Sequence, residues 1–367
     1  MHDIATSQIE FTRLPHPAPV PGASRDEAIA DPGFGKVFTD HMVTIDYTEG
    51  RGWHSATLGP RGPLSLDPAA SVLHYAQEIF EGLKAYKLED GAMALFRPEQ
   101  NAKRFNASAD RLAMPHLPED TFVEAIRQLV LADRDWFPAV EGGSLYIRPF
   151  MFASEAFLGV RPAKEYKFLV IASPAGNYFK SGVPAVSIWV SEDYTRAAPG
   201  GTGAAKCGGN YAASLVPQAE AIAKGHDQVV FLDAVERKWI EELGGMNLFF
   251  AFDDGTLLTP ELTGTILPGI TRDSILQLAR EEGLHVREGR YSLDQWRADA
   301  ESGKLLETFA CGTAAVVTPV GHVAGNSGEF TIGGGGPGQL TGRIRERLVG
   351  IQRGSVEDRH GWVHRLD

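Results

Sequence analysis

The sequence has little cysteine and no long apolar run. Its 2 cysteines in 367 residues, Cys207 and Cys311, match neither a metal-site spacing nor a redox pair. We therefore expect no metal site and a reducing, cytoplasmic location. Apolar runs such as "FLVIASP" and "VVFLDAV" are much shorter than the roughly 20 residues that span a bilayer. The opening residues lack the basic start and apolar centre of a secretory signal, so we expect no membrane association.

Excess positive charge is also lacking. The formal net charge is -12 and the sequence pI is about 5.4, whereas nucleic acids and anionic membranes favour a basic face. Neither is expected as a partner. A usual domain size of about 150 residues suggests two domains. We predict an N-terminal extension at 1–33, a small domain at 34–174, an interdomain loop at 175–184 and a larger domain at 185–367.

Strand and helix patterns alternate along the chain, which predicts a mixed α/β architecture. "EGLKAYKLEDGAMALFR" predicts a hairpin that turns at Asp90-Gly91, and a helix is expected between Pro98 and Pro115. "NYAASLVPQAEAIAKG" predicts one helix and "KWIEELGGMNLFFAF" one strand. "ITRDSILQLAREEG" predicts a helix that Gly283 ends.

The glycine-rich segments match no known nucleotide-binding loop. A P-loop needs glycine before its lysine and Ser or Thr after it, but Ala205 and Cys207 flank Lys206. A literal G-x-G-x-x-G occurs at 333–338, where it contains a proline and is followed by no strand of a βαβ unit. We interpret that segment as a flexible loop before the helix "QLTGRIRERLV".

The segment "GTILPGITRDS" is a stronger candidate for binding an anion. The amides of Ile270 and Thr271 would lie at a helix N-terminus, where unpaired N–H groups and the helix dipole favour negative charge. An ordinary capped helix is the alternative.

Lys206 lies in "GGTGAAKCGGNY", among glycines and other small residues that allow close approach to its amine. Most lysines are solvated surface charges. Burial, in contrast, would lower the pKa of this amine and make it a nucleophile for carbonyl compounds such as pyridoxal phosphate. Such a cofactor also needs a phosphate cradle, a partner for its ring nitrogen and a donor for its phenolic oxygen.

Several blocks in one order carry a resemblance to a known family. They include "FGKVFTDHM", "LHYAQEIFEGLKAY", "SLYIRPFMF", "GGTGAAKCGGNYAASL", "EELGGMNLFF", "LTGTILPGITRDS" and "FACGTAAVVTPV". The chain resembles the branched-chain amino acid aminotransferases, pyridoxal 5'-phosphate enzymes of fold type IV, from about Phe34 to its last helix. The resemblance implies a D-amino acid aminotransferase-like fold, with a smaller N-terminal α/β domain and a larger mixed pseudo-barrel domain. It also implies a homodimer.

The family implies a reversible transfer of the amino group between L-leucine, L-isoleucine or L-valine and 2-oxoglutarate, giving branched 2-oxo acids and L-glutamate. Lys206 is similar to the family's catalytic lysine, which binds the cofactor covalently. Glu242 would pair with the ring nitrogen and Tyr211 with the phenolic oxygen. The expected phosphate ligands are Arg104, the amides of Ile270 and Thr271, and the hydroxyl of Thr313.

The family also implies a substrate pocket. The Thr313-Ala314 turn would bind the α-carboxylate, and Arg148 the distal carboxylate of glutamate or 2-oxoglutarate. Val160 is expected to reach into the neighbouring subunit's site. The side-chain pocket would be shaped by Phe34, Tyr75, Tyr146 and Tyr178.

Other interpretations of these residues stay open. The aromatic residues are equally typical of a core, and Arg104 of a helix surface. Arg148 lies in an apolar strand, where an unpaired guanidinium is costly, so a paired or functional role is favoured.

The sequence departs from the family pattern at two places. Ala315 and Thr318 replace a C-x-x-C that some relatives carry, so we expect no thiol switch and a buried, inert Cys311. Gly245 stands where some members have threonine.

Three other functions are compatible with the sequence. A D-amino acid aminotransferase or an aminodeoxychorismate lyase would share the lysine and the cofactor. A non-catalytic nucleotide- or phosphate-binding protein would leave Lys206 idle.

Overall fold

The computed structural model describes residues 9–140, 142–176 and 185–366. The chain divides into two compact units. The N-terminal unit comprises Met1–Tyr178, Ala205–Gly208 and Gln352–Asp367, and the C-terminal unit comprises Phe179–Ala204 and Gly209–Ile351. The segment that carries Lys206 therefore belongs with the N-terminal unit, although the residues on both sides of it belong with the other.

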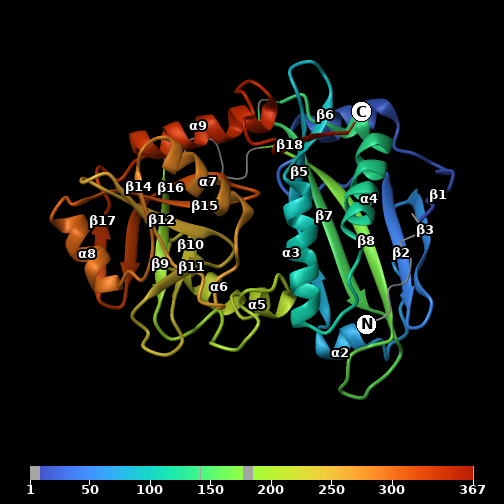
Figure 1. Cartoon of the computed structure of the whole chain (residues 1–367), viewed down its shortest axis with the longest axis horizontal. Helices are drawn as coiled ribbons and strands as arrows, with labels where there is room; N and C mark the ends of the chain where they lie inside the picture. The colour runs from blue at the N-terminus through green and yellow to red at the C-terminus, as the bar shows by residue number, and fades with distance from the viewer. Residues whose placement is uncertain (1–8, 141, 177–184, 367) are drawn as a thin grey trace. The chain divides into compact units, whose positions relative to one another are not determined.

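The N-terminal unit is built on a nine-stranded sheet in the order β1-β3-β2-β8-β7-β5-β6-β18, with β4 paired to β7 (Figure 1). The last strand comes from the C-terminal end of the chain and pairs antiparallel with β6. The strands are β1 (Thr12–Arg13), β2 (His41–Thr48), β3 (Gly52–Pro60), β4 (Glu78–Phe80), β5 (Leu83–Lys87), β6 (Met93–Phe96), β7 (Ser144–Ala153), β8 (Glu165–Ala175) and β18 (Val363–Arg365).

Strand β7 separates the core of this unit from a polar and aromatic face. Leu145, Ile147 and Met151 are fully buried in the core. Successive side chains of a strand point to opposite faces, so Tyr146 and Arg148 lie on the other side. Helices pack against this sheet, with α4 against β2, β7 and β8. The helices are α1 (Gly22–Ala30), α2 (Ser71–Tyr75), α3 (Pro98–Arg111), α4 (Glu119–Ala132) and the 3₁₀ turn η1 (Arg134–Trp136).

The C-terminal unit is also built on a nine-stranded sheet, in the order β11-β10-β9-β16-β15-β12-β13-β14, with β17 paired to β16. Strand β9 is parallel to both β10 and β16, whereas β12 is antiparallel to β13 and β15, so the sheet is mixed. The strands are β9 (Val186–Ser191), β10 (Gln228–Leu232), β11 (Ile240–Leu243), β12 (Asn247–Phe252), β13 (Thr256–Thr259), β14 (His285–Glu288), β15 (Leu305–Gly312), β16 (Val316–Gly325) and β17 (Gly328–Thr331).

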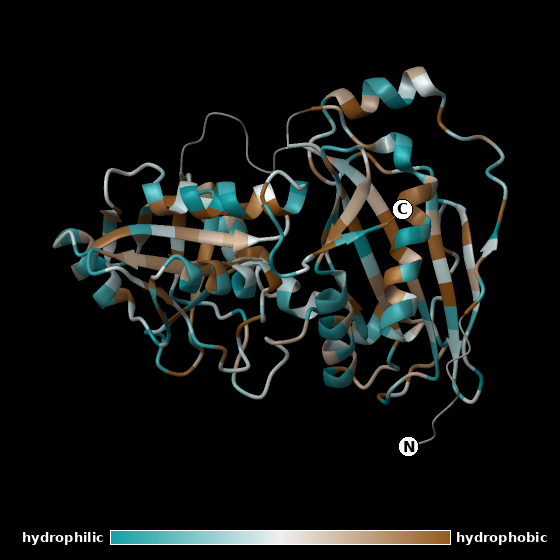
Figure 2. Cartoon of the chain, turned by 45° about the horizontal axis from the view of Figure 1, so that its top comes forward, coloured by the Kyte–Doolittle hydropathy of each residue, from teal (hydrophilic) through white to brown (hydrophobic). Residues whose placement is uncertain are grey.

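Helices of the C-terminal unit carry polar and apolar positions side by side, while the strands are largely brown and white in the hydropathy colouring of Figure 2. This is the pattern of amphipathic helices on a buried sheet. The helices are α5 (Gly208–Ala212), α6 (Leu215–Ala223), α7 (Ile270–Glu281), α8 (Leu293–Glu301) and α9 (Gln339–Arg353). No helix in the described part of the chain is long and apolar enough to cross a bilayer.

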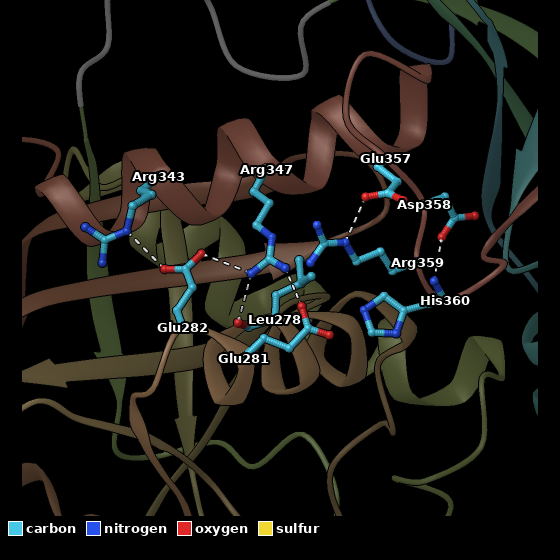
Figure 3. A network of polar contacts seen from close by, with 9 residues as sticks. All are labelled: Leu278, Glu281, Glu282, Arg343, Arg347, Glu357, Asp358, Arg359 and His360. Atoms are coloured by element: carbon cyan, nitrogen blue, oxygen red, sulfur yellow. Dashed lines mark hydrogen bonds and ion pairs between the residues drawn. The ribbon is translucent and has the colours of Figure 1, made fainter.

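Ion pairs join α9 to the end of α7 (Figure 3). Arg347 pairs with both Glu281 and Glu282, and it donates to the carbonyl of Leu278 at 3.2 Å. Arg343 adds a 3.0 Å contact to Glu282. These contacts fix the C-terminal end of α7.

Most predicted elements are present, and two are divided. The Asp90-Gly91 hairpin is formed by β5 and β6, with Gly91 at a φ of 87°. The single strand predicted at 238–252 is wrong: it is two strands, because Leu243 donates to the carbonyl of Met246 at 3.0 Å across a glycine turn. The helix predicted at 210–225 is also divided, into α5 and α6, and the Ser214 hydroxyl bonds the carbonyl of Tyr211 between them.

Candidate functional site

Lys206 is tied through its backbone to β4 and α3. Its carbonyl accepts the Phe80 N–H at 3.0 Å, and its own N–H donates to the Ser108 hydroxyl at 2.9 Å. Two residues later, the N–H of Gly208 donates to the carboxylate of Glu78. The lysine is partly buried. Its position is thus fixed by regular elements on both sides, although the loop that carries it has no regular structure.

The Lys206 amine lies 4.8 Å from the centroid of the Phe80 ring, and the Arg148 guanidinium lies 4.8 Å from the same ring. Phe80 pairs with Phe150 across β4 and β7, so its side chain shares the face of Arg148 and Tyr146. Arg148 donates to the Tyr146 hydroxyl at 3.1 Å, and Phe34 packs edge-on against Tyr146 at 4.9 Å. The structure therefore brings together four of the predicted residues, Lys206, Arg148, Tyr146 and Phe34.

The Nε atom of Arg148 is buried and has no hydrogen-bond partner among the residues that the structure describes. A buried donor left unsatisfied costs about 1–3 kcal/mol. The guanidinium is nevertheless held in place by two aromatic rings, Phe80 and Tyr146. This combination of a fixed cation and a spare donor suits the recognition of a carboxylate.

Arg104 does not lie on a helix surface; its side chain is only 9% exposed. Its Nε and Nη2 atoms donate to both carboxylate oxygens of Glu81, at 2.7 and 2.9 Å. Asn101 adds a third donor to Glu81 at 2.8 Å. Burial acts to raise the pKa of the Glu81 carboxyl, but the charge and hydrogen bonds of Arg104, then the charge of Lys206, outweigh it and hold that pKa below its ordinary value.

Two predicted pocket residues form a separate, exposed group. The Tyr75 hydroxyl donates to the carbonyl of Leu158, which joins the end of α2 to the loop that carries Val160. Val160 is 88% exposed and Leu158 61% exposed. Tyr178, also predicted for the pocket, lies outside the described residues.

In the C-terminal unit, the candidate residues gather around the turn between β11 and β12. Glu242, the third residue of β11, has a side chain that is only 2% exposed. Its Oε1 atom accepts Nη1 of Arg196 at 2.8 Å and the N–H of Leu267 at 2.9 Å. The Arg196 guanidinium and the Leu267 amide therefore hold this carboxylate in the interior.

Neighbouring glycines show what else lies against this turn. A Cβ atom on Gly245 would lie 3.8 Å from the ring of Tyr211, and one on Gly312 would lie 3.3 Å from the side chain of Met246. Tyr211 and the turn that begins at Gly312 and contains Thr313 and Ala314 therefore both approach the β11–β12 connection.

Helix α7 begins beside the same connection. A Cβ atom on Gly269, its N-cap, would lie 2.0 Å from Oδ1 of Asn247, and Asn247 donates to the carbonyl of Leu267 at 3.1 Å. No side chain within residues 9–140, 142–176 and 185–366 caps this helix. The first-turn amides of Ile270 and Thr271 are groups for which a helix has no internal acceptor. The two amides predicted to bind the phosphate thus follow Leu267 along the chain, and the Leu267 N–H donates to Glu242.

The sequence model described as "Amino-transferase class IV" matches residues 78–323. A branched-chain-amino-acid aminotransferase of Mycolicibacterium smegmatis is 57% identical over 363 residues, which are 98% of this chain and 99% of that protein. A probable one of Streptomyces coelicolor is 61% identical over 99% of this chain and 100% of its own. The chain belongs to the branched-chain aminotransferases of class IV. The predicted family and transaminase class are confirmed.

Solved members of this family have the same fold. The branched-chain amino acid aminotransferase of "Eschelichia coli" matches with a TM-score of 0.72 and 32% identity, over 83% of this chain and 94% of that one. The "T.th." enzyme complexed with N-(5'-phosphopyridoxyl)-L-glutamate matches with a TM-score of 0.72 and 29% identity, over 88% of this chain and 98% of that one. The predicted fold class is confirmed.

Both cysteines of this aminotransferase are unpaired and buried. Burial raises the pKa of the Cys311 thiol well above its ordinary value, with the charge of Arg272 opposing it. A thiol that stays protonated is a poor nucleophile, which agrees with the inert role predicted for Cys311. Among the described residues, no group of His, Cys, Asp and Glu could hold a metal ion.

Three charged residues of the site were missed from the sequence. Glu81 anchors Arg104, Arg196 pairs with Glu242, and Glu78 holds the backbone after Lys206. Burial raises the pKa of Glu78, and the Gly208 amide and the Arg148 charge act against it. A sequence signal existed for the two glutamates: both stand in the otherwise apolar run "EIFEGL", where a charge needs a partner.

Proposed function

We propose that Lys206 binds pyridoxal 5'-phosphate covalently and that this chain exchanges amino groups between the branched-chain L-amino acids and 2-oxoglutarate. The observation that carries the proposal is the placement of two cations against one ring. The amine of Lys206 and the guanidinium of Arg148 each lie 4.8 Å from the centroid of Phe80. A catalytic amine and a carboxylate-binding group therefore share one aromatic wall.

The residues of the chain fit this cofactor group by group. Glu242 is a buried carboxylate suited to a protonated ring nitrogen, and Tyr211 offers a hydroxyl for the phenolic oxygen. Arg104 is a fixed guanidinium, and the uncapped amides of Ile270 and Thr271 suit a phosphate. The hydroxyl of Thr313 is proposed as a further phosphate ligand. A solved relative is described as complexed with N-(5'-phosphopyridoxyl)-L-glutamate, which supports this choice.

When bound, the cofactor supplies an aldehyde that takes the amino group and a ring that takes up the electron pair of the broken Cα–H bond. Lys206 then acts as the general base that moves the Cα proton, a role that typically contributes 10²–10⁴-fold to rate. Thr313 and Ala314 hold the α-carboxylate. Glu242 provides the negative charge that would pair with the ring nitrogen.

Two kinds of substrate side chain must be accepted by one pocket. The rings of Phe34, Phe80 and Tyr146 offer apolar contact to a branched side chain, and Arg148 at their edge offers donors to a distal carboxylate. One methylene changes binding by only about 1–3 kcal/mol. Leucine, isoleucine and valine are therefore all expected to react.

We further propose that the chain acts as a homodimer in the cytoplasm. Leu73, Tyr75, Leu158 and Val160 are apolar or aromatic side chains with exposed fractions of 58%, 41%, 61% and 88%. Clustered exposed apolar residues favour a protein partner, and Val160 is proposed to enter the partner's site. Val160→Asp should lower the mass measured by light scattering, whereas Val235→Asp, at another exposed valine, should not change it.

The catalytic assignment is tested by Lys206→Ala, with L-leucine and 2-oxoglutarate as substrates. We expect activity to fall by at least about 10²-fold, with an unchanged circular dichroism spectrum. Lys224→Ala is the matched control, because Lys224 also lies over an aromatic ring, 3.6 Å from the centroid of Trp189. Near-normal activity of Lys206→Ala would contradict the proposal.

A further inference from the structure

Arg196 and Glu242 form an ion pair in the interior of the C-terminal unit, and no role has been assigned to Arg196. Both side chains are 2% exposed, and Nη1 of Arg196 lies 2.8 Å from Oε1 of Glu242. The same Nη1 atom contacts the carbonyls of Thr265 at 3.0 Å and Gly203 at 3.3 Å. The arginine is therefore held by the glycine-rich loop on one side and by the loop before α7 on the other.

This pair is poorly explained by stability alone. Removing two charges from water is costly, so a buried ion pair is weak evidence of stabilisation. Arg196 adds a further cost, because its Nε atom is buried and finds no hydrogen-bond partner in the described part of the chain. An apolar residue of similar volume would avoid both costs. The presence of Arg196 is thus better explained by its effect on the charge and orientation of the Glu242 carboxylate.

The neighbouring Glu241 shows what happens to a carboxyl on this strand without such a contact. It is also buried, at 7% exposed, and it accepts the hydroxyl of Thr265 instead of a guanidinium. Burial raises the pKa of Glu241, with the charge of Asp233 acting in the same direction, and the Thr265 hydrogen bond and then the charge of Arg196 only partly oppose that effect. Direct contact with a cation is what favours the ionised form of a buried carboxyl.

We propose that Arg196 is a positioning residue for the amino-transfer reaction, which keeps Glu242 ionised and fixes its orientation toward the ring nitrogen of the cofactor. This inference rests on the proposed role of Glu242. With the cofactor bound, one proton would lie between the Glu242 carboxylate and the ring nitrogen. The cation lowers the proton affinity of the carboxylate, so the proton stays on the ring, where the positive charge is needed to take up electrons.

The test compares two ligands that differ only at the atom in question. Apoenzyme is titrated with pyridoxal 5'-phosphate and with its 1-deaza analogue, in which a C–H group replaces the ring nitrogen. Arg196→Gln should weaken binding of pyridoxal 5'-phosphate by about tenfold or more, the size of a charge-assisted hydrogen bond. Its effect on the analogue should be less than about twofold. General damage to the fold affects both ligands alike and cancels in their ratio.

Two further variants complete the design. Arg196→Lys retains the charge and should restore most of the selectivity for the natural cofactor; it also replaces Arg196→Gln if that variant does not fold. Arg272→Gln is the matched control, because Arg272 is also buried and contacts a carboxylate, that of Glu288, at 2.8 Å. It should leave the ratio of the two affinities unchanged.

The outcomes separate this inference from the function on which it rests. Equal losses for both ligands in the Arg196 variants would reduce the arginine to a structural role and overturn the inference. The role of Glu242 would survive that result if Glu242→Gln still weakened binding of the natural cofactor selectively. If Glu242→Gln also affected both ligands equally, the assignment of Glu242 itself would be wrong.

Discussion

The two units each contain a buried glutamate–arginine pair among their candidate residues, but the pairs are used in opposite ways. In the N-terminal unit, Glu81 is fully buried and Arg104 is the partner proposed to reach the ligand. In the C-terminal unit, Arg196 is the anchor and Glu242 is the partner proposed to reach it. One pair thus offers a positive group for a phosphate, and the other a negative group for a ring nitrogen.

This difference shows how a buried charge is prepared for a ligand. Each anchoring residue has two other contacts: the Asn101 amide and the Gly82 N–H for Glu81, and the carbonyls of Gly203 and Thr265 for Arg196. The ligand-facing group is then held in one orientation before the ligand arrives, which reduces the entropy lost on binding. Arg104 and Glu242, which the family resemblance identifies, therefore depend on Glu81 and Arg196, which it does not identify.

The largest effect is expected from Glu81→Ala. Arg104 would remain buried without its carboxylate, and breaking a buried pair in this way costs about 3–5 kcal/mol. Urea unfolding of the apoenzyme measures this loss. Glu99→Ala, which removes an exposed partner of His364, should change the free energy of unfolding by less than about 1 kcal/mol. Similar values for the two variants would show that Glu81 is not an anchor.

Arg148→Met should change substrate preference more than stability. Loss of a charged donor to a carboxylate costs about 1.5–3 kcal/mol, so kcat/KM for 2-oxoglutarate should fall about 10- to 150-fold relative to that for 4-methyl-2-oxopentanoate. The control is Arg353→Met, since Arg353 also lies over a tyrosine ring, that of Tyr86, at 5.6 Å. An unchanged ratio for Arg148→Met would remove this arginine from substrate recognition.

The Glu81 pair should also make stability depend on pH. Because the pKa of Glu81 in the folded protein lies below its ordinary value, its contribution is present above that ordinary value, near 4.5, and is lost as the pH falls through the folded pKa. Unfolding followed from pH 7 to pH 3 should therefore show a steeper loss of stability in the wild type than in Glu81→Gln. Parallel curves would contradict the lowered pKa.

The smallest effect is expected from Gly245→Thr. The new Cβ atom would lie 3.8 Å from the ring of Tyr211, an ordinary van der Waals distance, so stability should change by less than about 0.5 kcal/mol. Gly203→Ala gives the contrast, because its Cβ atom would lie 2.3 Å from the carbonyl oxygen of Thr265. Thermal melting of both variants should therefore show a clear loss only for Gly203→Ala.

Sequence patterns were sufficient to predict turns and helix ends, which depend on neighbouring residues. They predicted the turn at Gly91, the start of α3 at Pro98 and the N-terminus of α7 at Ile270, because glycine and proline act on the backbone where they stand. Lys206 could be singled out by its small neighbours. The roles of its partners came from the family resemblance and not from the pattern.

The site contacts that the sequence did not predict join segments that are far apart in the chain. Glu81 and Arg104 are 23 residues apart, and Leu267 donates to Glu242 across 25 residues. No local periodicity reports such pairs. The turn after Leu243 is different, because Gly244-Gly245 is itself a local turn signal that the single predicted strand ignores. The sheet order gives β11 and β12 different neighbours.

The most direct test of the account is reduction of the cofactor-loaded enzyme with sodium borohydride, followed by proteolysis and mass spectrometry. The account predicts a pyridoxyl phosphate adduct on the peptide that contains Lys206, and a loss of the yellow colour as it forms. An unmodified Lys206, or an adduct confined to another lysine, would contradict the central claim.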